Sequence, residues 1–322
     1  MSKKAKKAKG VKIKTKKTGL SKVNKILSII LILLIVVGGI YIYIAPAKVA
    51  RAPKEEIDVE KPVIDEFAAG TYGGVQFNSV DDVVKYYVEV FNYNKTLTAP
   101  YKEDGASKTY YKLLGDEELN VMNIEVDGQP NSTIEGLVPT VLGGLFHGSP
   151  KGLPPAANRD PVYDDRDDGP NGSKLSQRES HLVADDVLAC NVKDNGDGTI
   201  TIQIQPKPQE LAQADADPQG RFFNVLGDIT ATVGSISVLS FTEGDANSNV
   251  KVMYGGGYGE VTIDTASKEV VKAYYIMRVH IDVTHAKVLV IRDKSASLDI
   301  EYTNTFPASD DFLMKSKKIT RG

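Results

Sequence analysis

The longest uninterrupted run of hydrophobic residues lies near the N-terminus of the chain. Residues 26–44 (ILSIILILLIVVGGIYIYI) contain no charged residue and one serine. A helix of this length spans about 28 Å, which matches the hydrocarbon core of a bilayer. Tyr41 and Tyr43 fall near one end of the run, where membrane helices commonly carry aromatic residues. The pattern predicts a single transmembrane helix over residues 26–44.

A cleaved signal peptide is the alternative interpretation of this run. Ala45, Pro46 and Ala47 follow it and resemble a small-residue cleavage site. However, the run is longer than the usual hydrophobic core of a signal peptide, roughly 7–15 residues, and Pro46 lies inside the cleavage site. Both features favour an uncleaved membrane anchor.

A stripe of hydrophobic residues at helical spacing begins after residue 79. Residues 45–70 come before it and are rich in Pro and charged residues, so they predict a linker. Ser79 is followed three residues later by Asp82, a variant of the capping box that opens a helix. We therefore expect a helix from Val80 to Lys95. Its hydrophobic stripe, typical of core packing, consists of Val80, Val83, Val84, Tyr87, Val88 and Phe91.

Alternation of hydrophobic and polar residues dominates the second half. It predicts strands over Thr199–Gln205, Val270–Val283 and Leu298–Phe306, with a hairpin connection from Glu260–Asp264 into the second of these. On the long strand, the hydrophobic face runs from Val271 to Val283. The other face carries Lys272, Tyr274, Arg278, His280 and Asp282.

These patterns predict the architecture. We expect an N-terminal single transmembrane helix, followed by an extracytoplasmic domain over residues 71–322. That domain is predicted to be of the α+β class, with a twisted antiparallel β-sheet and one or two packed helices. Between residues 221 and 239 helix and strand patterns compete, and we favour a short helix ending near Gly234.

Charge divides the chain sharply. Residues 1–54 hold 14 Lys or Arg and no Asp or Glu, whereas residues 55–322 hold 25 basic and 42 acidic side chains. A Lys-rich flank stays in the cytoplasm, so we expect residues 1–25 to be a cytoplasmic tail and the C-terminal domain to be extracellular. The acidic domain argues against nucleic-acid binding. Six lysines of this tail are candidates for contact with anionic lipid: Lys12, Lys14, Lys16, Lys17, Lys22 and Lys25. The alternative is that they serve only as a topology signal.

The middle of the chain predicts an irregular loop over about residues 148–180, because Pro, Asp and Gly are frequent there. Crowded carboxylates in this loop predict weak calcium binding, and a solvated acidic loop is the alternative. The carboxylates are those of Asp164, Asp165, Asp167 and Asp168. Residues 193–199 (KDNGDGT) also resemble a calcium loop superficially, but Lys193 and Ile204 would occupy ligand positions, so we expect a hairpin turn.

The sequence contains no recognisable catalytic or metal-ligand pattern, and we expect no cofactor. Cys190 is the only cysteine, which excludes an internal disulfide, and it follows Val187-Leu188-Ala189 without the threonine of a sortase strand. Such a cysteine is typically a buried small hydrophobic residue. No Ser-x-Met motif of signal peptidases occurs in the chain, and His280 and His285 are expected on opposite faces of a strand.

Three segments carry a family resemblance. The helix NSVDDVVKYYVEVFNYNK, the hairpin DVLACNVKDNGDGTITIQI and the strand pair YGEVTIDTASKEVVKAYYIMRVHIDV together resemble uncharacterised membrane-anchored surface proteins of Gram-positive clostridia, over much of residues 77–306. The resemblance implies a location at the cell envelope, and it assigns no activity and no functional residue. An exported domain without disulfides also fits a Gram-positive envelope.

We therefore predict a membrane-tethered extracytoplasmic binding or interaction module. Its partners would be the bilayer, through residues 26–44, and an envelope ligand or protein. A helix of about 24 Å cannot cover a strand of about 45 Å, so the remaining apolar face either closes into a core or forms a groove for an apolar or amphipathic ligand. The groove would be lined by Tyr275, Met277, Val279, Ile281, Ile300 and Tyr302. The alternative is an envelope enzyme, sortase-like or another hydrolase or transferase, with an unrecognised site.

Overall fold

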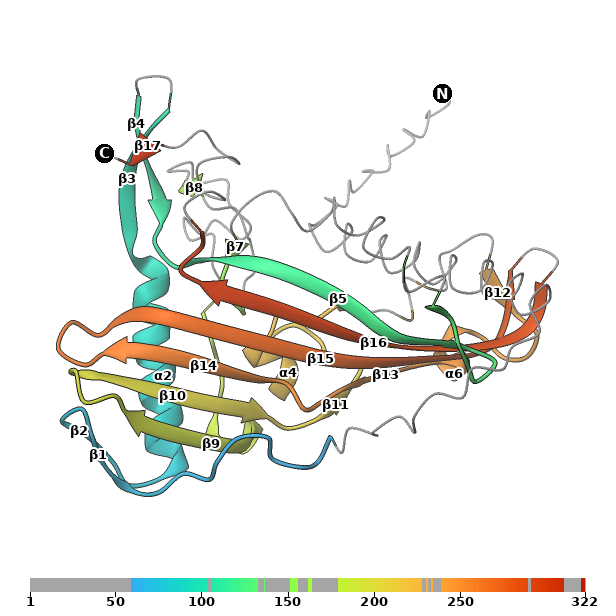
Figure 1. The fold of residues 1–322 in the computed structure, drawn as a ribbon, viewed down its shortest axis with the longest axis horizontal. Helices are drawn as coiled ribbons and strands as arrows, with labels where there is room; N and C mark the ends of the chain where they lie inside the picture. Colours follow the sequence, from blue (N-terminus) through green and yellow to red (C-terminus); the bar gives the residue numbers. More distant parts are fainter. Residues whose placement is uncertain are drawn as a thin grey trace, which may run out of the picture.

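The structure is a computed structural model of the chain. It describes residues 59–103, 106–132, 136, 151–155, 162–163, 179–227, 230, 233, 239–288, 291–309 and 320–321. Most of the described strands belong to one large antiparallel sheet, which runs in the order β6-β5-β16-β15-β14-β10-β9 (Figure 1). These strands are β5 (Leu114–Val126), β6 (Gln129–Pro130), β9 (Val187–Asp194), β10 (Thr199–Pro206), β14 (Tyr258–Asp264), β15 (Glu269–Val288) and β16 (Ile291–Phe306).

Strand β15 is the central strand of this sheet and pairs with four others. β16 pairs with it along most of its length, from Ala273↔Phe306 to Val288↔Ile291. On its other side three strands follow one another: β14, then β13 (Val250–Tyr254), then β12 (Leu239–Phe241). The remaining short strands are β1 (Gly70–Tyr72), β2 (Val75–Phe77), β3 (Thr98–Glu103), β4 (Ala106–Tyr111), β7 (Lys151–Gly152), β8 (Val162–Tyr163), β11 (Gln209–Glu210) and β17 (Thr320–Arg321).

The predicted α+β class, with its N-terminal transmembrane helix, is wrong for the described part of the chain. That part is mostly β, and its helices are α2 (Val80–Thr96), α4 (Pro218–Phe222) and α6 (Ala246–Asn249), with the 3-10 turn η2 (Ala184–Asp186). No helix in the described segments is long and apolar enough to cross a membrane. The predicted membrane span and the lysines before it lie outside the described residues.

Helix α2 begins where the capping pattern predicts. The Ser79 hydroxyl accepts a hydrogen bond from the Asp82 backbone N–H (3.2 Å), and the Asp82 carboxylate accepts one from the Asn78 N–H (2.8 Å). The helix crosses one face of the sheet (Figure 1). Val80, which the stripe placed in the core, is 37% exposed. The side chains that the helix buries are Val83, Val84, Tyr87, Val90, Phe91, Asn94 and Lys95.

Alternation along β15 separates a buried face from a polar face. Tyr275, Met277, Val279 and Ile281 are at most 3% exposed and pack in the core. The helix α4 adds Phe222, whose ring lies 5.4 Å from that of Tyr275. The predicted alternation is therefore confirmed from residue 273 to residue 283, except that Ile276 on the other face is also buried.

The sheet ends at β9, whose free edge is partly closed. The Val192 backbone N–H donates to the side-chain oxygen of Asn191 (2.8 Å), and the Gly73 N–H of the β1–β2 hairpin donates to the Asp194 carboxylate (2.7 Å). The end of the predicted linker also lies against the sheet, because the Gln205 side chain bonds the Lys61 carbonyl and the Val63 N–H. These contacts fix the first described residues to the domain.

Candidate functional site

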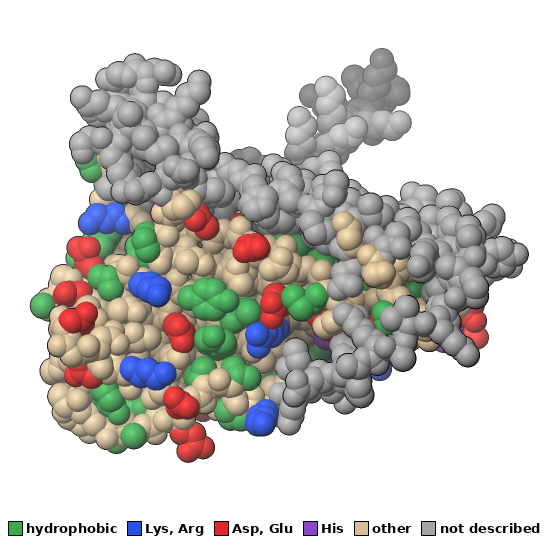
Figure 2. Space-filling view, viewed as in Figure 1, with side chains coloured by type: hydrophobic (Ala, Val, Ile, Leu, Met, Phe, Trp, Pro, Cys, Tyr) green, Lys and Arg blue, Asp and Glu red, His purple; other side chains and the backbone are tan. Residues whose placement is uncertain are grey.

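A cleft of about 310 Å³, lined mainly by polar residues, lies next to α6. Figure 1 shows α6 at the end of the sheet opposite α2. Five elements contribute to it. The lining residues are Glu125, Gly128, Asn249, Lys251, Asp282, Val283, Thr284, Ser295, Ala296 and Ser297. The cleft belongs to the face of the sheet that α2 does not cover. Figure 2 views that face, and acidic and basic side chains are interspersed with hydrophobic ones over its visible part.

Strand register places four of these polar residues in one row. Glu125 of β5 faces Ser297 of β16, Ser297 faces Asp282 of β15, and Asp282 faces Lys251 of β13. Neighbouring strands lie about 4.8 Å apart, so the row extends over roughly 14 Å. It combines two carboxylates, one hydroxyl and one ammonium group.

A local irregularity in β5 creates this alignment. The pairing of β5 with β16 shifts between Ser297 and Asp299, and Asn123 lies in the left-handed region at φ +52°. Asn tolerates that conformation better than most residues. The shift brings Glu125 onto the polar face opposite Ser297, between the buried residues Ile124 and Val126.

The charged groups of the row are only partly compensated. Glu125 is half-buried, and among the described residues its carboxylate has no hydrogen-bond or ion-pair partner. The exposed Lys251 likewise forms no ion pair within the described part of the chain. The Glu125 carboxylate therefore has acceptor positions open to a ligand with a donor group.

The neighbouring row contains a histidine between two carboxylates. His280 Nδ1 lies 2.6 Å from Asp299 Oδ1, and His280 Nε2 lies 3.2 Å from Asp282 Oδ1. The Asn123 side chain donates to the other Asp299 oxygen (2.7 Å). Asp282 therefore belongs both to the wall of the cleft and to this histidine network.

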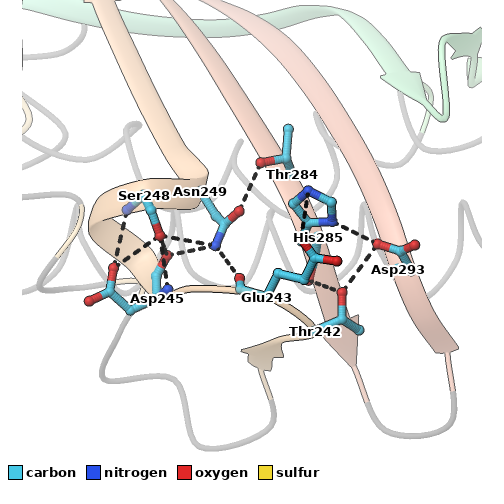
Figure 3. Close-up of polar contacts among 8 residues, drawn as sticks. All are labelled: Thr242, Glu243, Asp245, Ser248, Asn249, Thr284, His285 and Asp293. Carbon is cyan, nitrogen blue, oxygen red and sulfur yellow. Dashed lines mark hydrogen bonds and ion pairs between the residues drawn. The ribbon is translucent and has the colours of Figure 1, made fainter.

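The rim of the cleft is held by hydrogen bonds around α6 (Figure 3). Asn249 is 5% exposed, and its side-chain oxygen accepts from the Thr284 hydroxyl (3.0 Å). Its amide donates to the carbonyls of Glu243 (2.6 Å) and Asp245 (2.9 Å). Gly244 has φ +65°, and a Cβ there would lie 2.3 Å from the Ser248 hydroxyl. Asn249 is thus a structural part of the rim, with its amide already satisfied.

A second histidine–carboxylate pair lies beside this rim (Figure 3). His285 Nδ1 lies 2.9 Å from Asp293 Oδ1, and the Thr242 hydroxyl donates to the same oxygen (3.1 Å). The bond from His285 and then that from Thr242 lower the pKa of the Asp293 carboxyl. The pair fixes the end of the β15–β16 hairpin and does not line the cleft.

Within the described residues, no histidine ring nitrogen is found in hydrogen-bond contact with a Ser or Cys side chain. A nucleophilic Ser or Cys needs an imidazole nitrogen in hydrogen-bond reach. The described histidines instead direct ring nitrogens at carboxylates, at Asp215 from His181 and at Asp293 from His285. No group of three His, Cys, Asp or Glu with metal-ligand geometry occurs among the described residues.

A scan of protein-family models and searches of curated proteins and solved structures found no match. The assignment of a site therefore depends on the geometry of this chain alone.

The six residues predicted to line an apolar groove lie in the core. Their exposed fractions do not exceed 5%, which corresponds to the core-closure alternative; they are Tyr275, Met277, Val279, Ile281, Ile300 and Tyr302. Tyr302 and Ile300 of β16 pair with Met277 and Val279 of β15 within this closed layer. The predicted calcium ligands, Asp164, Asp165, Asp167 and Asp168, lie outside the described residues.

Cys190 is buried, as its sequence context predicts. Its side chain is in the core of β9 and 3% exposed, and burial raises the pKa of the thiol to about 11. The thiol is neutral at physiological pH and a poor nucleophile.

Sequence reasoning missed the cleft. It assigned His280 and Asp282 correctly to the polar face of the long strand, but only the register with β5, β13 and β16 shows which polar residues meet there. One local signal was present: Asn123 and the Asp127-Gly128 pair are residues that tolerate left-handed backbone, and all three have positive φ.

Proposed function

We propose that this protein is a membrane-tethered binding module of the cell envelope, and that the polar cleft beside α6 is its ligand site. The proposal for the tether relies on the sequence of residues 26–44 and the Lys-rich tail. The proposal for the site relies on one observation above all. A half-buried Glu125 without a partner among the described residues faces a cleft that also presents Ser297, Asp282 and Lys251.

The chemistry of the lining favours a small polar ligand or the polar end of a larger one. Carboxylate, hydroxyl and ammonium groups bind hydroxyls and charged groups through directional hydrogen bonds. A volume of about 310 Å³ is at the lower end of small-molecule sites. Val283 and Ala296 contribute apolar surface to the cleft, while the apolar core residues of the sheet pack against α2 and α4.

The test is a binding screen on the full-length chain in detergent. The probes are lysine amide, glucosamine, N-acetylglucosamine and glycerol phosphate, which offer amine, hydroxyl and phosphate groups. Backbone NMR signals of Gly128, Thr284 and Ser297 would report binding in the cleft. We expect at least one probe to shift these signals in a saturable way.

Variants of two glutamates on the same strand provide the control. Glu125→Gln removes the charge in the cleft, and we expect roughly a tenfold loss of affinity for the bound probe, the value of one charged hydrogen bond. Glu118→Gln changes an exposed glutamate of β5 outside the cleft and is expected to bind like the natural chain. Absence of any saturable shift would refute the proposed site.

A further inference from the structure

The position of Asp282 connects the cleft to a titratable group. One carboxylate oxygen lies 3.2 Å from His280 Nε2, while the side chain as a whole lines the cleft and is 48% exposed. His280 is held in place from the other side by Asp299 (2.6 Å). A doubly protonated imidazole donates to both carboxylates, whereas the neutral ring donates to one of them.

We propose that the cleft binds ligands through a protonated primary amine, and that His280 weakens this binding as the pH falls by competing for Asp282. This inference rests on the proposed function, because it assigns the ligand class and the pH dependence of the same site.

The row of side chains suits an ammonium group. Glu125 and Asp282 lie on either side of Ser297, so their backbones are separated by two strand spacings, roughly 10 Å. An ammonium group between them would donate to two carboxylates and the serine hydroxyl, which uses its three N–H groups. An anion between Glu125 and Asp282 would instead meet two like charges, and the one cation of the row, Lys251, lies beyond Asp282 on β13.

The imidazole of His280, whose charge changes with pH, contacts Asp282 beside the proposed ammonium position. Histidine is the side chain that ordinarily changes charge between about pH 5 and 8, and His280 is the histidine in contact with Asp282. The protonated ring neutralises Asp282 and repels a ligand ammonium. The neutral ring leaves Asp282 to the ligand, so proton release accompanies amine binding.

The neighbouring charged groups on the strands next to His280 are either paired with another residue or lie at the border of the cleft. On β15, Arg278 is paired with Glu301 of β16 at 2.9 Å. Lys251 on β13 and Glu125 on β5 border the cleft, and the residues of β13 and β5 in the same row as His280 are the uncharged Met253 and Met122. Among the described residues, Asp282, Asp299 and His280 are therefore the titratable groups in direct contact at this place.

The probe for the test is Nα-acetyl-lysine methylamide, whose amine stays protonated between pH 5 and 8. Its affinity for the full-length chain would be measured by NMR titration at both limits. We expect affinity to rise about tenfold from pH 5 to pH 8, as one added charge near the site would produce. The Nε-acetylated probe, which lacks the charge, should not bind. Glucosamine at pH 7 tests whether an amino sugar supplies the amine better than a lysine side chain; tighter binding of either supports the ligand class.

Two histidine variants separate the pH effect from general effects. In His280→Gln the amide still reaches the carboxylates without titrating, and we expect amine affinity at pH 5 to equal that at pH 8. His181→Gln removes another Asp-paired histidine, which does not line the cleft, and should keep the tenfold dependence. Asp282→Asn should lose amine binding at both pH values.

The outcomes distinguish the two proposals. Equal affinity of the natural chain at pH 5 and 8, or unchanged pH dependence in His280→Gln, would overturn the role of His280. Binding of N-acetylglucosamine or glycerol phosphate in the cleft without binding of either amine would overturn the ligand class but support the proposed function. Absence of binding by every probe would overturn both.

Discussion

The hydroxyl oxygens of Tyr87 and Tyr275 lie 2.8 Å apart in the core. Tyr87 comes from α2 and Tyr275 from the centre of β15, and both side chains are at most 1% exposed. Burial raises the pKa of both hydroxyls above the ordinary value for tyrosine. Both are therefore neutral, and one donates to the other across the helix–sheet interface.

Removal of either hydroxyl should destabilise the domain by about 1–3 kcal/mol, because the remaining one is buried without its partner. Tyr87→Phe and Tyr275→Phe provide the single variants. Their combination should cost less than the sum of the two, since two phenylalanines leave no unsatisfied hydroxyl. Urea denaturation measures all four proteins, and strictly additive losses would contradict the pairing.

Cys190 should be inert in the folded protein. Its pKa of about 11 and its burial predict that a thiol reagent at pH 8 modifies it only after unfolding. Cys190→Ala should lower the free energy of unfolding by about 1 kcal/mol and leave ligand binding intact. Rapid modification without denaturant, or loss of binding in a folded Cys190→Ala protein, would indicate a chemical role.

Acid should destabilise the hairpin turns. The backbone N–H of Gly73 and then that of Gly196 lower the pKa of Asp194, and the Ser267 N–H with its hydroxyl lowers that of Asp264. A carboxyl with a lowered pKa in the folded state contributes stability above its unfolded value, about 3.9, and loses it as the pH falls through the folded value.

The free energy of unfolding in urea should therefore change little between pH 7 and 5 and decrease below about pH 4. Asp194→Asn should be less stable at pH 7 and lose less on acidification. Asp185→Asn, at an exposed aspartate for which no hydrogen bond within the described residues is found, should follow the natural protein. Identical pH profiles for all three would show that Asp194 is not involved.

Membrane orientation can be tested on protoplasts. If the Lys-rich tail is cytoplasmic, protease added outside should digest the domain from about residue 55 onward and spare residues 1–25. Complete protection of the domain would reverse the predicted orientation. A mature protein that begins near Lys48 would show instead that residues 26–44 are a cleaved signal.

Local patterns predicted the elements well where one effect dominates. The Ser79 cap, the turn at residues 194–199 and the alternation of Thr199–Gln205 follow from hydrogen bonding and side-chain periodicity within a few residues. Val271 is a residue whose burial the local alternation predicted wrongly. It was expected on the buried face, but a bulge between β14 and β15 leaves it 45% exposed and turns Val270 inward.

The fold class and the cleft depend on contacts that are distant in sequence. The helical and strand patterns together led to the prediction of an α+β protein. Among the described helices, however, only α2 is longer than five residues. The cleft combines Glu125 with Lys251 and Asp282, and no local pattern specifies that these three share one face. The strand register, which is set by packing of the whole sheet, determines that these three residues lie on one face.

The partly closed edge of β9 affects whether neighbouring copies of the chain can pair through their strands. Molecules confined to a membrane plane meet at a much higher effective concentration than free ones. An open strand edge would then recruit a neighbouring copy and start a fibre. Asn191 occupies the Val192 N–H, and the β1–β2 hairpin bonds Asp194 nearby, so these two positions of the border are closed to an approaching strand. If residues 26–44 tether the chain to a membrane as proposed, many copies would share one membrane patch as separate molecules.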